Sequence, residues 1–258
     1  MNELLNKTTS VMIVTYNRLA LTRRMLKSLF EKTNSDFRLI IVDNGSADES
    51  AEFLKLLQPM QESQYCKSYD LELHPKNLGI ASGRNKALLI ADKYKDPYLS
   101  TMDNDIELID NWLPKCIEVI DKNSNFVVGL NMEEVNYPIT EVNGVTVQLK
   151  PQGNCGTAHT VFPRSLHSAI GYFNTEFGLY GEEDADYFIR ARVVGYKISY
   201  LPENGIHFGV GENDVGEYRE FKTKMHAENL EKFRACCYQY YGKQKPIYTK
   251  YSCIDEQS

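Results

Sequence analysis

Two aspartates that flank an asparagine are the residues whose types and spacing most directly suggest chemistry. Asp103-Asn104-Asp105 follows the apolar run Tyr98-Leu99-Ser100-Thr101-Met102, which is typical of a buried strand. Residues i and i+2 of a strand point to the same side, so the two carboxylates can converge beyond its end. A hard divalent cation with open positions for phosphate oxygens suits such a pair best. The alternative is a solvated turn, because Asp and Asn favour turns.

The composition describes an ordinary globular protein. The chain has 258 residues, of which 42% are hydrophobic and 25% are charged, and its formal net charge is -6. This length allows one large domain or two small ones with a well-filled core. The negative net charge argues against a general nucleic-acid binder, so we expect no nucleic-acid partner.

The sequence shows no signal for membrane insertion or for a disulfide framework. No apolar run approaches the roughly 20 residues of a membrane-spanning helix, and the N-terminus lacks the apolar core of a secretory signal. We therefore expect a cytoplasmic protein. The six cysteines include no Cys-x-x-Cys pair, which predicts free thiols rather than a disulfide or a zinc site.

Buried strands and amphipathic helices alternate through the first half of the chain. Residues 10–16 are continuously apolar and β-branched, as is typical of a central parallel strand, and further strands are predicted at residues 37–43, 69–73 and 98–102. Apolar residues at helical spacing follow the first three runs, at residues 19–30, 51–57 and 87–91. This alternation implies βαβ units and a parallel, helix-covered sheet. In such sheets the ligand site lies beyond the carboxyl ends of the strands, where Tyr16, Asp43, Asn77 and the aspartate pair all fall.

The second half contains fewer regular signals. They predict a strand at 126–130, a hairpin at 139–149 turned by Asn143-Gly144, a helix at 183–194 and a strand at 197–201. From Glu212 onwards, apolar residues at helical spacing predict a long amphipathic C-terminal helix; they are Tyr218, Phe221, Met225, Phe233, Cys237 and Tyr240. Without a linker or an internal repeat, we expect one domain with a C-terminal extension.

Over residues 9–208 the chain resembles the GT-A glycosyltransferases of family 2. Seven ordered motifs carry the resemblance: Val14-Thr15-Tyr16-Asn17-Arg18, Val42–Asp48, Asn77-Leu78-Gly79 with Gly83-Arg84-Asn85, Asp103-Asn104-Asp105, Gly181–Asp186, Gly195-Tyr196-Lys197-Ile198 and His207. The resemblance implies an α/β, Rossmann-like fold with a mostly parallel central sheet flanked by helices. It implies a catalytic domain at 1–208, with a nucleotide-sugar half at about 9–108 and an acceptor half at about 109–208, followed by an extension at 209–258.

The resemblance also implies a donor site. Thr15, Tyr16 and Asp43 would line the base pocket, where a carboxylate can accept from a pyrimidine imide N–H and a ring can pack on the base. UDP is favoured on this ground, although thymine and guanine also offer such a donor. The alternatives are a core aromatic for Tyr16 and a helix cap for Asp43. Asn17, Arg18 and Asn104 join the donor site by their places in the motifs.

The diphosphate and a metal ion would lie beyond the base pocket. The resemblance places Asn77, Gly79 and Arg84 by the ribose and pyrophosphate, with Arg84 offering a planar fork to phosphate unless it is an exposed surface residue. Asp103 would contact the ribose, and Asp103 and Asp105 would bind Mn²⁺ or Mg²⁺. His207 is a further candidate ligand that favours Mn²⁺, with a structural histidine as the alternative.

Glu183-Asp184 opens the helix predicted at 183–194. The resemblance assigns Asp184 as the general base that deprotonates an acceptor hydroxyl, which implies single displacement with inversion. The doubled acid departs from the usual pattern and leaves Glu183 as a rival, and plain helix capping remains an alternative. Four residues are candidates for contacts to a glycan or lipid-linked acceptor: Tyr137, Asn154, His159 and Tyr180.

Alternative functions, and the role of the C-terminal segment, stay open. A protein of the same fold that binds a nucleotide-sugar without catalysis is the alternative function. A nucleotidyltransferase or dinucleotide-dependent enzyme on a similar sheet is a third hypothesis. The absence of a Gly-x-Gly-x-x-Gly motif after the first strand, and of a P-loop, argues against dinucleotide and P-loop chemistry. The C-terminal helix would pack on the core or form a lid with Tyr218 or Arg219 near phosphate. The tail, with Lys243, Lys245, Tyr248, Lys250 and Tyr251, could touch the inner face of an anionic membrane.

Overall fold

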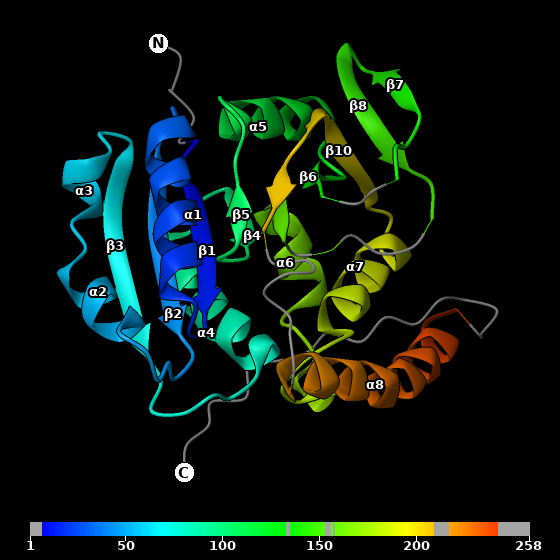
Figure 1. Cartoon of the computed structure of the whole chain (residues 1–258). Coiled ribbons are helices and arrows are strands. Elements are labelled where there is room, and N and C mark those ends of the chain that lie inside the picture. Colours follow the sequence, from blue (N-terminus) through cyan, green and yellow to red (C-terminus); the bar gives the residue numbers. More distant parts are fainter. Residues whose placement is uncertain (1–6, 133–134, 153–155, 157, 209–216, 242–258) are drawn as a thin grey trace.

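The four predicted strands of the first half form the parallel strands of a central sheet. The computed structural model describes residues 7–132, 135–152, 156, 158–208 and 217–241 (Figure 1). The strands are β1 (Thr9–Thr15), β2 (Phe37–Asp43), β3 (Cys66–Leu73) and β4 (Tyr98–Met102). They lie side by side in the order β3-β2-β1-β4, and every pair is parallel. Their carboxyl ends therefore meet at one edge, as the sequence predicts.

Alternation along these strands supplies two hydrophobic cores, one on each face of the sheet. The helices of this half are α1 (Leu19–Lys32), α2 (Ser50–Leu56), α3 (Pro59–Glu62) and α4 (Ile80–Tyr94). Ile13 of β1 points to the face covered by α1, whereas Met12 points to the face covered by α4. Continuous apolar strands are expected where both faces of a sheet are buried.

The second half extends the same sheet with strands of both directions. Its elements are β5 (Ile106–Glu107), α5 (Trp112–Lys122), β6 (Phe126–Asn131), β7 (Ile139–Val142), β8 (Val145–Lys150), β9 (His159–Pro163), α6 (Arg164–Ile170), the 3₁₀ turn η1 (Thr175–Phe177), α7 (Glu183–Val193), β10 (Lys197–Asn204) and β11 (Ile206–His207). The full order is β3-β2-β1-β4-β9-β6-β10-β8-β7, in which β9 and β8 run against the other strands. The predicted α/β fold with a mostly parallel central sheet is thereby confirmed.

A separate two-stranded sheet lies beside the main one. β5 pairs with β11 in antiparallel fashion, with His207 opposite Ile106. This short sheet brings the residue after the last long strand next to the segment that follows the aspartate pair.

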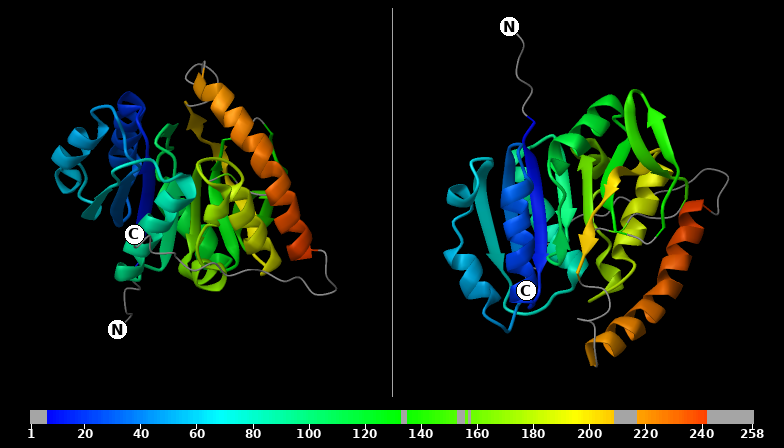
Figure 2. Two further views of the ribbon diagram at one scale, coloured as in Figure 1. Left: turned by 90° about the horizontal axis from the view of Figure 1, so that it is seen from below. Right: turned by 45° about the horizontal axis from the view of Figure 1, so that its top comes forward.

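The predicted C-terminal helix is α8 (Glu217–Tyr241), which packs along α7 (Figures 1 and 2). The contact differs from the predicted apolar stripe. Among the described side chains of α8, the buried ones are Asn229 and Tyr240, while Phe221, Met225 and Phe233 are only half-buried. Tyr240 donates a 2.6 Å hydrogen bond to Asp186 of α7. Polar contacts therefore hold much of this helix in place.

The structure also bears on the predictions for the cysteines and for membrane contact. Cys66, Cys116, Cys236 and Cys237 are free thiols, as predicted for the described part of the chain. Within that part, none of the helices combines the length and the apolar character that crossing a bilayer requires. The tail residues that were predicted to touch a membrane lie outside the described residues.

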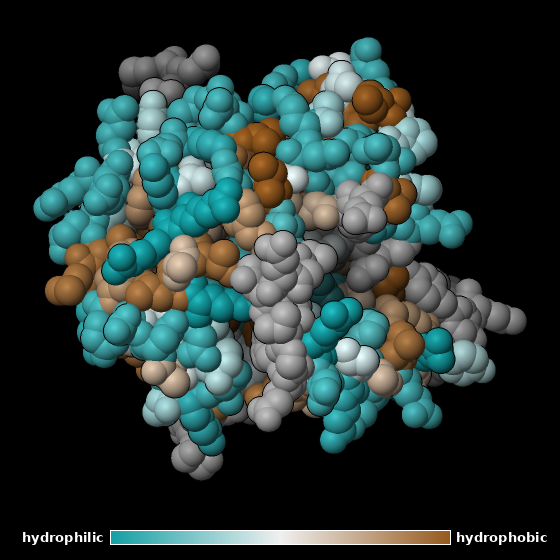
Figure 3. Space-filling view, viewed as in Figure 1, coloured by the Kyte–Doolittle hydropathy of each residue, from teal (hydrophilic) through white to brown (hydrophobic). Residues whose placement is uncertain are grey.

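An apolar band covers part of the surface over α1 and α2 (Figure 3). Here Leu26, Phe30, Phe53 and Leu57 line a groove between the helices. The other residues that line the groove are Arg23, Lys27, Glu31 and Glu62, which carry charges of both signs.

Candidate active site

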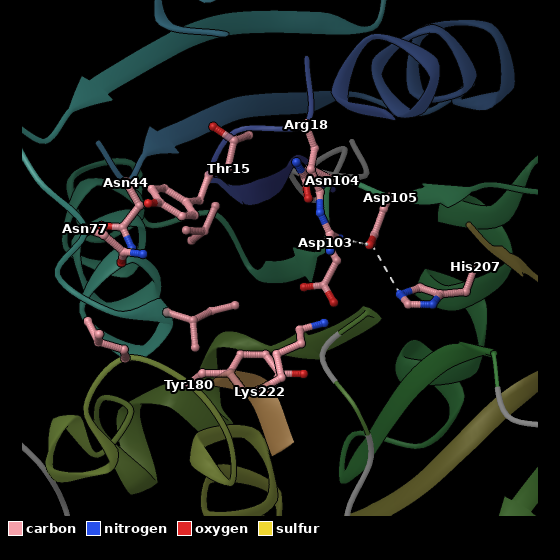
Figure 4. A pocket seen from close by; sticks show the side chains of 14 residues that line it. Thr15, Arg18, Asn44, Asn77, Asp103, Asn104, Asp105, Tyr180, His207 and Lys222 are labelled. Atoms are coloured by element: carbon pink, nitrogen blue, oxygen red, sulfur yellow. Dashed lines mark hydrogen bonds and ion pairs between the residues drawn. The ribbon is translucent and has the colours of Figure 1, made fainter. Parts of the chain in front are cut away.

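A pocket lies at the carboxyl edge of the parallel strands (Figure 4). Its floor comes from residues that end or follow β1, β2 and β4, and its other wall comes from the segment before α7 and from α8. The lining residues are Val14, Thr15, Tyr16, Arg18, Asn44, Asn77, Ile80, Asp103, Asn104, Asp105, Leu179, Tyr180, His207 and Lys222. The pocket thus collects site residues that were predicted from four separate motifs.

Asp103, Asp105 and His207 form a cluster with metal-ligand chemistry. One ligand atom from each lies within 4.8 Å of the other two. The backbone fixes this arrangement, because Asp103 donates its N–H to the carbonyl of Ala158 at 3.0 Å and Phe208 donates its N–H to the carbonyl of Asp105 at 2.7 Å. Two carboxylates and one imidazole are a donor set that suits Mn²⁺ and, less well, Mg²⁺.

The charges around Asp105 are balanced while one oxygen stays available. Arg18 donates to Asp105 Oδ2 at 2.9 Å, and His207 Nε2 lies 3.2 Å from Oδ1. Burial opposes ionisation of Asp105, but His207, Arg18 and Lys222 outweigh it and lower its pKa. The buried Oδ1 accepts no hydrogen bond of good geometry from the described residues. An orphaned carboxylate oxygen beside an imidazole fits a cation.

The pKa values of Asp103 and His207, the two other members of the cluster, are both raised. The raised pKa favours the neutral form of Asp103 but the charged form of His207. Burial raises the pKa of Asp103, and the neighbouring Asp105 adds to this rise while Arg84 opposes it. Contact with Asp105 raises the pKa of His207 against the effect of burial. Both shifts reflect one crowded acidic centre, in which added positive charge is favourable.

Arg84 is not among the residues that line the pocket, and its predicted contact with phosphate stays a prediction. Its guanidinium is 6% exposed and donates to Glu183 at 2.7 Å and to Asp103 at 3.1 Å. The predicted alternative of an exposed arginine is wrong, because Arg84 is buried. The adjacent Gly83 packs on Val14 so closely that a Cβ would lie 2.7 Å from its Cγ1. This face of α4 points inward, and Arg84 bridges two acids inside the protein.

Glu183 and Asp184 have different environments although they are adjacent. Glu183 is 5% exposed, and burial together with Asp184 raises its pKa to about 7 against the effect of Arg84. Asp184 is half-buried and accepts its own neighbour's N–H, from Ala185, at 2.6 Å. Its charge also contributes to the pKa shifts of Arg84 and Asp103, after burial and closer ions. Asp184 therefore lies near the cluster with more access to solvent than Glu183.

The predicted base-pocket residues surround the end of β1. Thr15 and Tyr16 line the pocket, and Tyr16 is 38% exposed, so it is not a core aromatic. Asp43 is buried behind them and accepts from Thr15 Oγ1 at 3.0 Å and from the N–H of Ser46 at 2.9 Å. Asp43 does not cap α2, where Asp48 accepts from the N–H of Ser50. The direct contact of Asp43 with a base stays a prediction.

Asparagine side chains shape the next part of the pocket. Asn17 Oδ1 accepts the N–H of Ala47, which ties the loop after β1 to the loop after β2. Asn44 donates to Asn77 at 2.9 Å and to the carbonyl of Gly79 at 3.0 Å. Asn104 donates to Thr22 of α1. These amides hold three loops of the strand edge in one arrangement.

Gly79 allows the donor half to touch the segment before α7. Its φ is +89°, and a Cβ there would lie 2.2 Å from the carbonyl oxygen of Gly178. We expect Gly79→Ala to lower the free energy of unfolding by about 1–3 kcal/mol, through strain and this clash. Urea unfolding measures it. Gly144→Ala is the matched control, because Gly144 has a φ of +74° with nothing within 4 Å of its added Cβ. Equal losses in both variants would contradict the role of the close approach.

The acceptor candidates fall in different places. Tyr180 lines the pocket, whereas Tyr137 stacks on Tyr200 with 5.7 Å between ring centroids. Asn154 lies outside the described residues. His159 is 1% exposed, accepts the N–H of Leu130, and burial lowers its pKa to about 3. His159 is therefore a core residue, and its predicted contact with an acceptor is wrong.

Sequence reasoning missed several lining residues, of which Lys222 is the most consequential. Lys222 belongs to α8, whereas the predicted lid residues were Tyr218 and Arg219. Arg219 is exposed, and the side chain of Tyr218 lies outside the described part of the structure. Counting one further helical turn along the same face would have reached Lys222. Asn44 stands inside a quoted motif and could have been found from its place after β2.

Sequence comparison finds relatives with transferase names. The family model described as "Glycosyl transferase family 2" matches residues 10–165. The succinoglycan biosynthesis protein ExoM of Rhizobium meliloti (strain 1021) is 24% identical over 214 residues, which cover 78% of this chain and 66% of ExoM. The chain spans between 14% and 66% of the length of the curated relatives it matches.

Solved structures with a similar fold include two nucleotide complexes. S. aureus TarS 1–349 in complex with UDP has a TM-score of 0.60 and 17% identity, and the match covers 92% of this chain and 72% of TarS 1–349. The mannosyltransferase PcManGT from Pyrobaculum calidifontis, in complex with GDP-Man and Mn²⁺, has a TM-score of 0.58 and 15% identity, with 89% and 72% of the two chains covered. At these identities the likeness concerns the fold.

Proposed function

Because this chain belongs to glycosyl transferase family 2, we propose that it transfers a sugar from a nucleoside diphosphate sugar to a hydroxyl of a glycan or lipid-linked acceptor. The observation that carries the proposal is the cluster of Asp103, Asp105 and His207 in one pocket with Thr15 and Tyr16. The named nucleotide and Mn²⁺ complexes of the structural neighbours support it.

The nucleotide base binds at the end of β1. The half-exposed ring of Tyr16 offers a face for the base, and Thr15 presents the edge behind which Asp43 is buried. In the proposed complex the Asp43 carboxylate accepts a hydrogen bond from the imide N–H of uracil, which favours UDP as the donor nucleotide.

A divalent cation completes the diphosphate site. Asp103, Asp105 and His207 are the residues that would hold Mn²⁺ or Mg²⁺. When bound, the cation supplies positive charge for the leaving diphosphate. Arg18 and Arg84 keep the two carboxylates oriented through their ion pairs at 2.9 and 3.1 Å.

Asp184 is the general base of the proposed reaction. It takes the proton of the acceptor hydroxyl while the acceptor oxygen bonds to the anomeric carbon and the bond from that carbon to the diphosphate breaks. Asp184 ends protonated, and the configuration at the anomeric carbon inverts. Glu183 is unsuited to this role because Arg84 holds its carboxylate in the interior.

A thermal-shift screen of nucleoside diphosphates tests the proposal. We expect UDP with Mn²⁺ to raise the melting temperature most, because a ligand at 100 times its Kd stabilises the folded state by about 2.7 kcal/mol. GDP, dTDP and uridine, each with Mn²⁺ or EDTA, serve as comparisons. If no nucleoside diphosphate shifts the melting temperature, the donor site is wrong. Release of UDP from UDP-sugars separates an enzyme from a binding protein.

A further inference from the structure

Two consecutive residues of α4 bind the second half of the chain through buried contacts. Asn85 donates to the carbonyl of Phe173 at 2.9 Å and accepts the N–H of Phe173 at 2.8 Å. Arg84 donates to Glu183, the first residue of α7, at 2.7 Å. A helix of the donor half therefore helps to fix the position at which α7 begins.

The guanidinium of Arg84 also reaches the proposed metal site. Its Nη2 donates to Asp103 Oδ1 at 3.1 Å, while its Nη1 donates to Glu183. Asp103 follows β4, and its carboxylate points into the pocket (Figure 4). The side chain of Arg84 is 6% exposed, so the bridge lies largely out of solvent. One buried side chain thus joins a proposed metal ligand to the helix that carries the proposed general base.

The first turn of α7 depends on contacts from outside the helix. Gly181 and Glu182, which precede it, have φ angles of +94° and +70°. A residue other than glycine at positive φ costs of the order of 1 kcal/mol or more. The side chain of Glu182 does not cap the helix and pairs with His226 instead. The ion pair between Glu183 and Arg84 is therefore a contact that holds the first turn in this strained position.

The bridge concentrates opposite charges at one buried cation. Burial lowers the pKa of the Arg84 guanidinium, but three neighbouring carboxylates outweigh burial and raise it. They are those of Glu183, Asp103 and Asp184. Groups in such a network polarise one another strongly because the local dielectric constant is low. A change of charge at Glu183 therefore alters how strongly Arg84 binds Asp103.

We propose that Arg84 is a positioning residue that sets the distance between the proposed metal ligand Asp103 and the proposed general base Asp184. This inference rests on the proposed function. One arm of the guanidinium orients the Asp103 carboxylate, and the other holds the turn of α7 that carries Asp184. The bridge also couples the two halves of the site through charge. The charge of Glu183, which does not line the pocket, then affects cation binding at Asp103.

Mn²⁺ binding to a Glu183→Gln variant tests the coupling through charge. The amide oxygen can still accept from Arg84, but the lost charge leaves the guanidinium to compete more strongly with a cation for Asp103. We expect the Kd for Mn²⁺, measured by calorimetry with UDP present, to rise about 3- to 10-fold, as for coupled residues of one network. The titration is made at pH 8, because burial raises the pKa of Glu183 to about 7 and its carboxylate is then mostly charged.

Glu182→Gln is the matched control for this titration. It removes the charge of the adjacent acid, which lies 2.9 Å from His226 and forms no ion pair with Arg84 among the described contacts. We expect this variant to bind Mn²⁺ with the wild-type Kd.

Turnover of an Arg84→Lys variant tests the positioning of the base. A lysine ammonium is a compact point charge and lacks the planar fork that reaches two carboxylates in fixed directions. We expect kcat for a UDP-sugar in saturating Mn²⁺ to fall about 10- to 100-fold, since small misplacements of reacting groups cost this much. In an Asp184→Asn background the same substitution should cause little further loss, because residues that act as a unit are not additive.

The outcomes separate the bridge from the donor site itself. If Glu183→Gln and Glu182→Gln bind Mn²⁺ equally well, the coupling is overturned while the donor site stands. If the losses of Arg84→Lys and Asp184→Asn multiply, Arg84 does not act through the base, and the positioning role is overturned. If Arg84→Lys does not fold, the Mn²⁺ comparison decides alone. If the wild-type chain binds neither UDP nor Mn²⁺, the proposed function fails, and the bridge fails with it.

Discussion

Asp184→Asn is expected to lower turnover by about 100-fold or more while donor affinity stays near that of the wild type. The amide keeps the shape of the side chain and its contact with the N–H of Ala185 but cannot take a proton from the acceptor. Loss of a general base typically costs 10²- to 10⁴-fold. Steady-state kinetics with a UDP-sugar, together with calorimetric titration of UDP, measures both quantities.

Glu183→Gln is the matched control for the general base. Glu183 is adjacent in sequence but buried and paired with Arg84 at 2.7 Å. We expect its replacement to change stability more than turnover, since it alters an internal ion pair. Wild-type turnover in Asp184→Asn, with a large loss in Glu183→Gln, would move the role of the base to Glu183.

Asp105→Ala is expected to weaken UDP binding in Mn²⁺ by at least about 10-fold and to leave binding in EDTA unchanged. Loss of residues that merely orient a metal ligand already costs 10- to 100-fold in metal affinity. Asp105 carries the orphaned buried oxygen of the cluster and also pairs with Arg18. Calorimetry of UDP binding in Mn²⁺, Mg²⁺ and EDTA separates the metal-dependent part of the affinity.

Glu107→Ala provides the control for the metal site. Glu107 lies two residues further along in β5 and pairs with Lys32 and Arg24 away from the pocket. Its loss should not alter the effect of Mn²⁺. Unchanged Mn²⁺-dependent affinity in Asp105→Ala would remove Asp105 from the metal site.

The first half of the fold could be predicted because local patterns and global packing agree there. The run at 37–43 is β-branched and apolar, and it forms β2 with the same bounds. In the second half, the predicted Asn143-Gly144 turn likewise joins β7 to β8, with both residues at positive φ. Where local propensity and tertiary context agree in this way, secondary structure can be predicted from the sequence.

The sequence analysis missed α5 and β9, whose residues give weak or misleading signals for secondary structure. α5 begins with Trp112-Leu113-Pro114, where the proline suggests a break in the chain although the first turn of a helix tolerates it. β9 is short, starts with His159 and lies between β4 and β6, so only tertiary contacts reveal it as a central strand. Propensity gives little weight to a five-residue strand in a glycine-rich region.

The sequence could predict which residues lie near the pocket, but it could not predict where their side chains point. The motifs located Arg84 near the pocket, yet only its ion pairs with Asp103 and Glu183 show that its guanidinium points inward. Likewise, the helical spacing of α8 was clear, but only the contacts of Asn229 show which face meets the pocket. Side-chain direction depends on tertiary packing that a linear pattern does not encode.

The small β5–β11 sheet has a thermodynamic consequence for ion binding. Asp105 and His207 lie about 100 residues apart, and joining the ends of a flexible loop of that length costs about 4 kcal/mol in chain entropy. The pairing of His207 with Ile106 sets this distance before any ion arrives. The proposed metal site is therefore preorganised, and binding of an ion there does not require closure of this loop.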